Sequence, residues 1–506
     1  MSNSSKSPTH ESDNNTLHDE EVASEAESSC EEEWQLLEES DGSGNEDENP
    51  EDLISKHDLV TAPIMTREAY LRVKSDRRAA QYGVLGRVLG VHHKAHVESL
   101  DDQRLYLNTN SPFSAIVCGV QGSGKSHTVS TILESMLISD FSGIGSLSKP
   151  LAGLVLHYGE GGASSLPNEA AWLANSISSH IIGPPVRVFV SRSSLQTMRT
   201  VYAPLGKRVT VEPLLLDSSE LDAAAILSMM AVGSSESAPL YMQIILSILR
   251  DLGELYSYAA FMKKLEVSKQ KFNPAQLTGL EQRLSLLTSF LDPTSSTQVK
   301  GKNIKSKSRF EKGHLTIVDL SDPFLDTSSA CGLFEIIVRL FVRADVDTGK
   351  VLVVDEAHKY LSSERSASGL TKSLLNLIRQ QRHLAMRVII STQEPTVVPP
   401  VLLDLCSVAI LHRFSSPNWW NHLIHHVPTD FSGTDAFDKV VRLQTGHAIV
   451  LAASGIGFFL PQDGTETAKQ DEKGKVLTRF GRRYIIMKTR KRVTADGGAS
   501  ILVVDS

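Results

Sequence analysis

The chain has 506 residues, of which 41% are hydrophobic, so it is long enough to bury a large core. No stretch approaches the roughly 20 consecutive apolar residues of a membrane span, and the amino terminus lacks the apolar region of a signal peptide. The sequence therefore predicts a soluble intracellular protein, cytoplasmic or nuclear, with no membrane partner. The cysteines contain no CxxC pair, which gives no indication of a zinc site or a disulfide framework; they are Cys30, Cys118, Cys331 and Cys406.

The net charge of −8 is unevenly distributed along the chain. Residues 1–55 contain 18 acidic residues and one lysine, which leaves 41 acidic and 50 basic residues in the remainder. A segment so acidic and so poor in apolar residues is predicted to be disordered, and we assign residues 1–56 to such a tail. The positive excess of the body is compatible with a polyanionic partner such as DNA.

The acidic tail contains one short aromatic pattern. Residues 31–39 read EEEWQLLEE, with Trp34 and Leu37 three positions apart between acidic residues. The pattern is similar to short linear motifs that bind ubiquitin-like autophagy adaptors, and it also fits an isolated amphipathic turn in a solvated tail. We therefore keep the tail as a candidate for binding a protein partner.

The hydrophobic pattern changes after a lead-in segment, residues 57–110, in which we expect a helix around 66–81. From residue 113 onward, apolar runs of about four to six residues alternate with helical segments, which predicts an α/β fold with a mostly parallel sheet covered by helices on both faces. The expected strands include residues 115–118, 154–156, 186–190, 315–318, 351–354, 388–390 and 408–411.

This pattern places one large domain at residues 111–495. Two features interrupt it, a helical insertion at about 220–290 and a basic surface loop at 294–313. Residues 496–506 are assigned to a carboxyl-terminal tail. A basic cluster precedes that tail and consists of Lys488, Arg490, Lys491 and Arg492. Three interpretations fit this cluster: a nuclear import signal, a phosphate contact or the charged end of a strand.

Residues 119–126 read GVQGSGKS and match the G-x-x-x-x-G-K-[ST] phosphate-binding loop at every fixed position. Backbone N–H groups of such a turn supply many donors at short range, and the following helix amino terminus favours an anion. The apolar run before the loop and the helical face after it provide the required strand–loop–helix context. We expect Lys125 to contact the β- and γ-phosphates of ATP and Ser126 to ligate Mg²⁺. The predicted nucleotide-binding residues are Gly119, Val120, Gln121, Gly122, Ser123, Gly124, Lys125, Ser126 and His127.

Two acidic residues follow the apolar run 351–354. Ligands bind at the carboxyl ends of the strands in open α/β sheets, so both side chains are expected near the phosphate loop. Asp355 is predicted to hold Mg²⁺, and Glu356 is predicted to orient and deprotonate the attacking water. Because a protein that merely binds nucleotide does not need the second carboxylate, Glu356 predicts ATP hydrolysis.

Gln393 ends the next predicted strand, and its amide can both donate to a γ-phosphate and position a water molecule. The alternative is a glutamine that caps the following turn. Upstream, Arg382 is the best candidate for an arginine that acts in a neighbouring subunit's site, ahead of Arg379 and Arg413. An ordinary salt bridge or a solvated helix end is the alternative for each arginine.

Together these motifs resemble the HerA/FtsK superfamily of P-loop ATPases, which includes conjugative coupling ATPases. The similar segments are GVQGSGKS, VLVVDEAH, IRQQRHLAMRVIISTQEP and LLDLCSVAILHRF, and the resemblance spans about residues 108–495. The resemblance implies a RecA-like core, a homo-oligomeric ring that is hexameric as in that family, and ATP-driven movement of DNA. It also supports a sensor role for Gln393 and a trans-acting role for Arg382. Lys125 and Asp355 are 230 positions apart, which predicts a large insertion between them.

Three functions remain open at this stage. The first is an ATP- and Mg²⁺-dependent motor or helicase-like protein that acts on DNA. The second is an AAA+-like ATPase that remodels proteins, a class in which an asparagine or threonine sensor is more usual than Gln393. The third is a nucleotide-dependent switch or scaffold with little turnover, which recruits partners through the acidic tail.

Overall fold

The structure is a computed structural model, and all its described residues fall in one compact unit, Leu53–Ser506. It describes residues 54–75, 81–94, 96–139, 141–230, 240–293, 308–361, 369–427, 434–460 and 474–498. The expected acidic tail up to residue 53, the Trp34 pattern, residues 294–307 of the basic loop and residues 499–506 lie outside the described residues.

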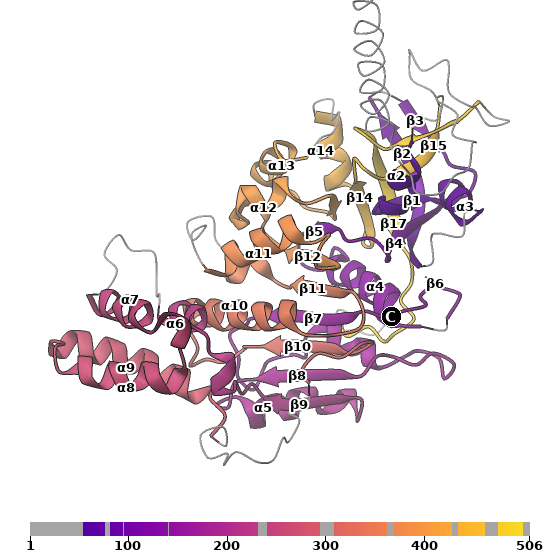
Figure 1. Ribbon diagram of the computed structural model, residues 1–506. Helices are drawn as coiled ribbons and strands as arrows, with labels where there is room; N and C mark the ends of the chain where they lie inside the picture. The colour runs from indigo at the N-terminus through magenta and orange to yellow at the C-terminus, as the bar shows by residue number, and fades with distance from the viewer. Residues whose placement is uncertain are drawn as a thin grey trace, which may run out of the picture. The chain divides into compact units, whose positions relative to one another are not determined.

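Half of the sheet is parallel, and it contains every strand expected from the apolar runs (Figure 1). Each of these strands is buried along most of its length because helices cover both faces. The observed α/β architecture confirms the predicted fold class. In spatial order the parallel strands are β9 (Val209–Pro213), β8 (Val186–Val190), β10 (Leu315–Asp319), β7 (Ala152–His157), β11 (Lys350–Val354), β12 (Met386–Thr392), β5 (Ser114–Cys118) and β13 (Val408–Leu411).

The other half of the sheet is mainly antiparallel and combines the lead-in segment with the end of the chain. It continues from β13 through β14 (His447–Leu451), β17 (Tyr484–Thr489), β2 (Tyr82–His93), β4 (Arg104–Asn108), β1 (Ile64–Thr66), β15 (Ile456–Phe459) and β16 (Val476–Arg479). Strands β3 (His96–Glu98) and β6 (Gly145–Ser146) pair with β2. The strands within residues 57–110 therefore belong to the same sheet as β5, which precedes the phosphate loop, and their apolar pattern did not reveal this.

The helix expected around residues 66–81 is shorter in the structure. Helix α3 spans Arg67–Ser75, Thr66 belongs to β1, and Gln81 directly precedes β2. Helix α2 (Lys56–Thr61) lies upstream and is capped by Ser55. None of the helices in the described part of the chain is both long and apolar enough to cross a bilayer.

Alternate residues of the central strands enter hydrophobic clusters on opposite faces of the sheet. In β11, Leu352 packs on one face and Val353 on the other. The face reached by Val353 is covered by α4 (Lys125–Leu137), η1 (Glu169–Ala174) and α5 (Leu195–Tyr202). The face reached by Leu352 is covered by α10 (Thr327–Arg343), α11 (Gly369–Gln380), α12 (Pro400–Asp404), α13 (Pro417–Ile424) and α14 (Thr434–Val441).

A group of helices is inserted between β9 and β10 in the chain, where the sequence predicts a helical insertion. Their apolar faces pack on one another and on α10 through buried side chains such as Phe261 and Leu280. Asn273 and Gln276 form a capping box that starts the last of them. The four helices are α6 (Ala223–Met230), α7 (Leu240–Leu252), α8 (Tyr258–Lys269) and α9 (Pro274–Ser289), seen together in Figure 1. Short 3₁₀ turns complete the described elements: η2 (Ala203–Leu205), η3 (Ser218–Glu220), η4 (Gly253–Leu255), η5 (Ala357–Lys359) and η6 (Pro395–Val397).

Candidate nucleotide-binding site

The glycine-rich loop connects the end of β5 to the start of α4, as its motif predicts. Gly122 and Gly124 have φ angles of 73° and 108°, a backbone conformation that side chains with a Cβ rarely adopt. A Cβ at Gly124 would also lie 2.9 Å from the Cα atom of Gly446. Gln121 and Gly122 are exposed, whereas Ser123 is buried and its hydroxyl donates to the carbonyl of Val120 at 2.7 Å. The loop therefore presents its backbone to solvent at a helix amino terminus, which suits an anionic ligand.

His127, in the first turn of α4, faces away from that exposed backbone. Its Nε2 lies 2.8 Å from the carbonyl oxygen of Arg490, and its Nδ1 lies 3.5 Å from Asp496. The structure thus connects His127 to the carboxyl-terminal segment, while Ser126 remains partly exposed beside the loop.

Three predicted side chains meet at the carboxyl edge of the parallel strands. The Lys125 ammonium lies 2.9 Å from Oε1 of Glu356, and the Gln393 amide donates to the other oxygen, Oε2, at 2.8 Å. Lys125 is only 5% exposed and Glu356 13%, so the ion pair is largely shielded from water. Strand β12, which ends just before Gln393, lies between β5 and β11, so three adjacent strand ends converge on Glu356. Glu356 itself has a φ of 49°, an uncommon conformation for a residue other than glycine.

Asp355 lies at the same edge, and its carboxylate is held by two residues that the sequence reasoning missed. His157 Nδ1 and Asn168 Nδ2 lie 3.0 and 2.9 Å from the same oxygen, Oδ2. Burial alone would raise the pKa of Asp355, but the hydrogen bonds from His157 and Asn168, together with the charges of His157 and Lys125, outweigh it and lower this pKa to about 2. His157 was detectable in principle, because it is a polar residue at the end of an apolar strand, as Asp355 is.

Oxygen donors at this edge suit Mg²⁺, which prefers carboxylate, hydroxyl, water and phosphate oxygens. The Ser126 hydroxyl and the Asp355 carboxylate are the protein groups that would hold it. The single carboxylate is in keeping with a metal that keeps most of its coordination sphere for water and substrate phosphates.

The arginine candidates lie outside this cluster. Arg382 is exposed in the turn that precedes β12, so it lies at the amino end of that strand, whereas Gln393 follows the carboxyl end. A seven-residue strand spans roughly 20 Å, so Arg382 does not reach the site of its own chain. Arg379, in the last turn of α11, is exposed as well. Arg413 is nearer, because its carbonyl accepts a hydrogen bond from the Val120 amide at 3.1 Å.

A buried histidine supports the base of the phosphate loop. His412 is fully buried, with Nδ1 3.0 Å from the carbonyl oxygen of His447 and Nε2 3.0 Å from the hydroxyl of Thr128. A neutral ring satisfies both contacts by donating to the carbonyl and accepting from the hydroxyl. Burial, together with the nearby charge of Lys125, lowers the pKa of His412 to about 4.

This histidine predicts a loss of stability in mild acid. The pKa of His412 is lower in the folded chain than in the unfolded chain, so between these two values the unfolded chain binds a proton that the folded chain does not. The contribution of His412 to the free energy of unfolding is therefore complete above about pH 6.5 and declines as the pH falls toward 4. Between pH 7 and pH 5, the free energy of unfolding of wild type should fall by about 2 kcal/mol more than that of His412→Asn. Urea unfolding at both pH values checks this, and an equal decline in the two proteins would contradict it.

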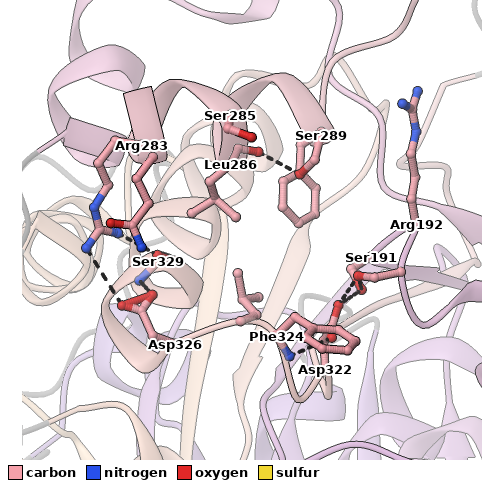
Figure 2. A pocket seen from close by; sticks show the side chains of 14 residues that line it. Ser191, Arg192, Arg283, Ser285, Leu286, Ser289, Asp322, Phe324, Asp326 and Ser329 are labelled. Carbon is pink, nitrogen blue, oxygen red and sulfur yellow. Dashed lines mark hydrogen bonds and ion pairs between the residues drawn. The ribbon is translucent and has the colours of Figure 1, made fainter. Parts of the chain in front are cut away.

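A separate cavity of about 480 Å³ lies between α9 and the loops after β8 and β10 (Figure 2). Its charged groups are paired within the protein: Asp322 accepts hydrogen bonds from Ser191 and Ser193, and Arg283 lies 3.9 Å from Asp326. The cavity lies beside the ends of β8 and β10, and β7 lies between β10 and β11, the strand that Asp355 and Glu356 follow. The cavity is therefore distinct from the site at the phosphate loop.

The glycine-rich loop between a buried strand and a helix, with its lysine beside a carboxylate two strands away, is the arrangement of a P-loop NTPase fold. No family model matches the sequence, and no curated protein matches it.

Several solved structures resemble this one. VirB4 of Thermoanaerobacter pseudethanolicus matches over 81% of this chain and 96% of its own, with 11% identity and a TM-score of 0.42. The bacterial conjugative coupling protein TrwB, lacking its first 70 residues, matches over 76% of this chain and 87% of its own, with 12% identity and a TM-score of 0.38. The genome packaging NTPase B204 from Sulfolobus turreted icosahedral virus 2, in complex with ATP-γS, matches over 28% of this chain, with 18% identity and a TM-score of 0.22; the chain spans 63% of its length.

Proposed function

We propose that this protein is an ATP-hydrolysing P-loop motor ATPase that acts on DNA as a translocase or helicase-like protein. The observation that carries the hydrolytic part is the cluster of Lys125, Glu356 and Gln393, joined by contacts of 2.9 and 2.8 Å beside Asp355. A site that only binds nucleotide does not need the second carboxylate, whereas hydrolysis needs a base for water.

In the proposed mechanism, the backbone N–H groups of residues 119–126 and the Lys125 ammonium bind the phosphates of ATP. Ser126 and Asp355 would hold Mg²⁺, which would neutralise part of the charge of the phosphates. The γ-phosphate replaces Glu356 as the partner of Lys125, so the Glu356 carboxylate becomes available to orient a water molecule and to accept its proton. The Gln393 amide would either keep its hydrogen bond to Glu356 and hold that carboxylate in place, or turn to the γ-phosphate.

Two observations support the DNA and ring parts of the proposal. The chain outside the acidic tail carries a positive excess, which suits a polyanion. Arg382 is exposed and lies far from the site of its own chain, which suits an arginine that completes the site of a neighbouring subunit. The sequence resemblance to HerA/FtsK proteins is in keeping with both, and with a homo-oligomeric ring.

The test is the ATPase activity of the purified full chain with and without duplex DNA over a range of salt concentrations, with the mass measured by light scattering. We expect an oligomer whose turnover rises with DNA, and a stimulation that falls steeply as salt increases. Turnover that ignores DNA at every salt concentration would refute the DNA partner and favour a protein-remodelling ATPase. Tight nucleotide binding without turnover would instead favour a switch or scaffold.

Replacing the lysine of the loop tests nucleotide binding directly. Lys125→Ala removes a charge-assisted contact to the phosphates, worth about 1.5–3 kcal/mol, so the affinity for ATP should fall roughly 10- to 150-fold. Titration with a fluorescent ATP analogue measures this loss. Lys359→Ala is the matched control, because Lys359 is an exposed lysine three positions after Glu356. A Lys125→Ala protein with wild-type ATP affinity would show that the loop does not bind the triphosphate.

A further inference from the structure

Two donors from separate segments converge on a single oxygen of Asp355. His157 is the last residue of β7, which runs beside β11, and its Nδ1 lies 3.0 Å from Oδ2. Asn168 lies eleven positions later in the chain, and its Nδ2 donates to the same oxygen at 2.9 Å. No described residue makes a hydrogen bond to the other oxygen, Oδ1, in the structure.

Asn168 is fixed on every side. It is only 4% exposed, and its side-chain oxygen accepts a hydrogen bond from the Ala170 amide at 3.0 Å, as the amino-terminal cap of η1. Because that contact occupies the oxygen, the amide nitrogen is the atom directed at Asp355. The backbone N–H of Asn168 donates at 3.0 Å to the hydroxyl of Tyr202, which in turn donates at 2.7 Å to Asp319.

His157 is likewise held between two acidic strand ends. The sheet register places it opposite Asp319 of β10 on one side, while Asp355 follows the paired end of β11 on the other. The backbone amide of Asp355 also donates to the carbonyl of Leu156 at 3.0 Å, which fixes the main chain beneath the carboxylate. Both donors to Oδ2 therefore come from rigid positions.

We propose that His157 and Asn168 are positioning residues that hold Asp355 in one orientation, so that Oδ1 alone is presented to the Mg²⁺ of the bound nucleotide. This inference rests on the proposed function. It follows from the geometry because two hydrogen bonds to one carboxylate oxygen oppose rotation of the group and oppose its binding a metal through both oxygens. Mg²⁺ requires near-ideal octahedral geometry, so a fixed single oxygen favours it over larger cations.

The test separates Mg²⁺ affinity from nucleotide affinity and from folding. Mg²⁺ increases the affinity for a fluorescent ATP analogue, and the Mg²⁺ concentration that gives half of this increase is the quantity to measure. In Asn168→Ala it should rise roughly 10- to 100-fold, the usual effect of removing a residue that hydrogen-bonds to a metal ligand. The affinity for the analogue in EDTA should stay near wild type, whereas the thermal unfolding temperature should fall by a few degrees because alanine also removes the cap of η1. Asn175→Ala is the matched control, since Asn175 ends the same 3₁₀ turn and its side chain makes no contact with Asp355. When the same titration is made with Ca²⁺, the preference for Mg²⁺ over Ca²⁺ should be smaller in Asn168→Ala than in wild type.

A second pair of variants keeps the inference falsifiable if Asn168→Ala does not fold. His157→Ala should show the same increase in required Mg²⁺, and His157→Asn, which restores a donor at the position of Nδ1, should recover most of the loss. Wild-type Mg²⁺ dependence in both alanine variants would overturn the positioning role while leaving the ATPase proposal intact. A loss of affinity for the analogue that is as large in EDTA as in Mg²⁺ would do the same. A wild-type protein that fails to bind ATP would instead refute the proposed function itself.

Discussion

Glu356→Gln should abolish steady-state ATP hydrolysis while preserving the binding of ATP. The substitution keeps the shape of the side chain but removes the group that would accept a proton from water, and loss of a general base reduces a rate by about 10²- to 10⁴-fold. The contact with Lys125 adds a second expectation. The Glu356 carboxylate lies 2.9 Å from the Lys125 ammonium, so it would compete with a phosphate for that contact. A neutral glutamine competes less, so the affinity for ATP should be equal to or higher than that of wild type.

Turnover by phosphate release and affinity by titration with a fluorescent ATP analogue measure these two effects separately. Glu160→Gln serves as the control, because Glu160 is an exposed glutamate in the segment after β7 at the same edge of the sheet. It should change neither quantity. Hydrolysis by Glu356→Gln at the wild-type rate would remove Glu356 from the mechanism, and a large loss of ATP affinity would show that the carboxylate has a role in binding.

The fold was predictable from the sequence where one local signal decides the structure. A buried parallel strand such as β11 is a continuous apolar run, because both of its faces are covered. The glycine-rich loop needs a backbone that bulkier residues rarely adopt, so its glycines mark it. Since the ends of parallel strands share one edge, residues far apart in the sequence, Lys125 and Glu356, were predicted to lie together, and the structure places them 2.9 Å apart.

The antiparallel half was missed because its signals are weaker. Strand β2 reads YGVLGRVLGVHH, in which glycines interrupt the apolar pattern, and its partner β17 lies about 400 positions later. The polar partners of the site were missed for a similar reason. Asn168 lies in a segment without periodicity, and only the three-dimensional path of the chain brings it to Asp355.

The carboxyl-terminal basic cluster shows how the same residue types take on different roles in three dimensions. Arg490 and Arg492 follow β17, and their charged groups turn inward, where each contacts an acidic residue. Arg490 contacts Glu134 of α4, and Arg492 contacts Glu169, the residue next to Asn168. Nuclear import and phosphate contact are therefore not open to these two side chains in the folded protein. Arg490 and Arg492 instead join the helix that begins with Lys125 to the segment that positions Asp355.

Glu134→Ala should therefore destabilise the protein by about 3–5 kcal/mol, the usual effect of removing one partner of a buried ion pair. Glu134 is fully buried in α4; its Oε1 accepts hydrogen bonds from the backbone amides of Val493 and Thr494 at 3.0 and 2.9 Å, and its Oε2 lies 2.6 Å from Arg490. Alanine leaves these donors and a buried guanidinium without an acceptor. The free energy of unfolding in urea measures the loss.

The double variant Glu134→Ala, Arg490→Met separates the charge from the packing. If the uncompensated guanidinium causes most of the loss, removing it should recover part of the stability, so the two substitutions should be less harmful together than their separate effects predict. Strict additivity would mean instead that the backbone hydrogen bonds of residues 493 and 494 dominate. A loss below about 1 kcal/mol in Glu134→Ala would show that water replaces the carboxylate, which is incompatible with a closed junction between α4 and the end of the chain.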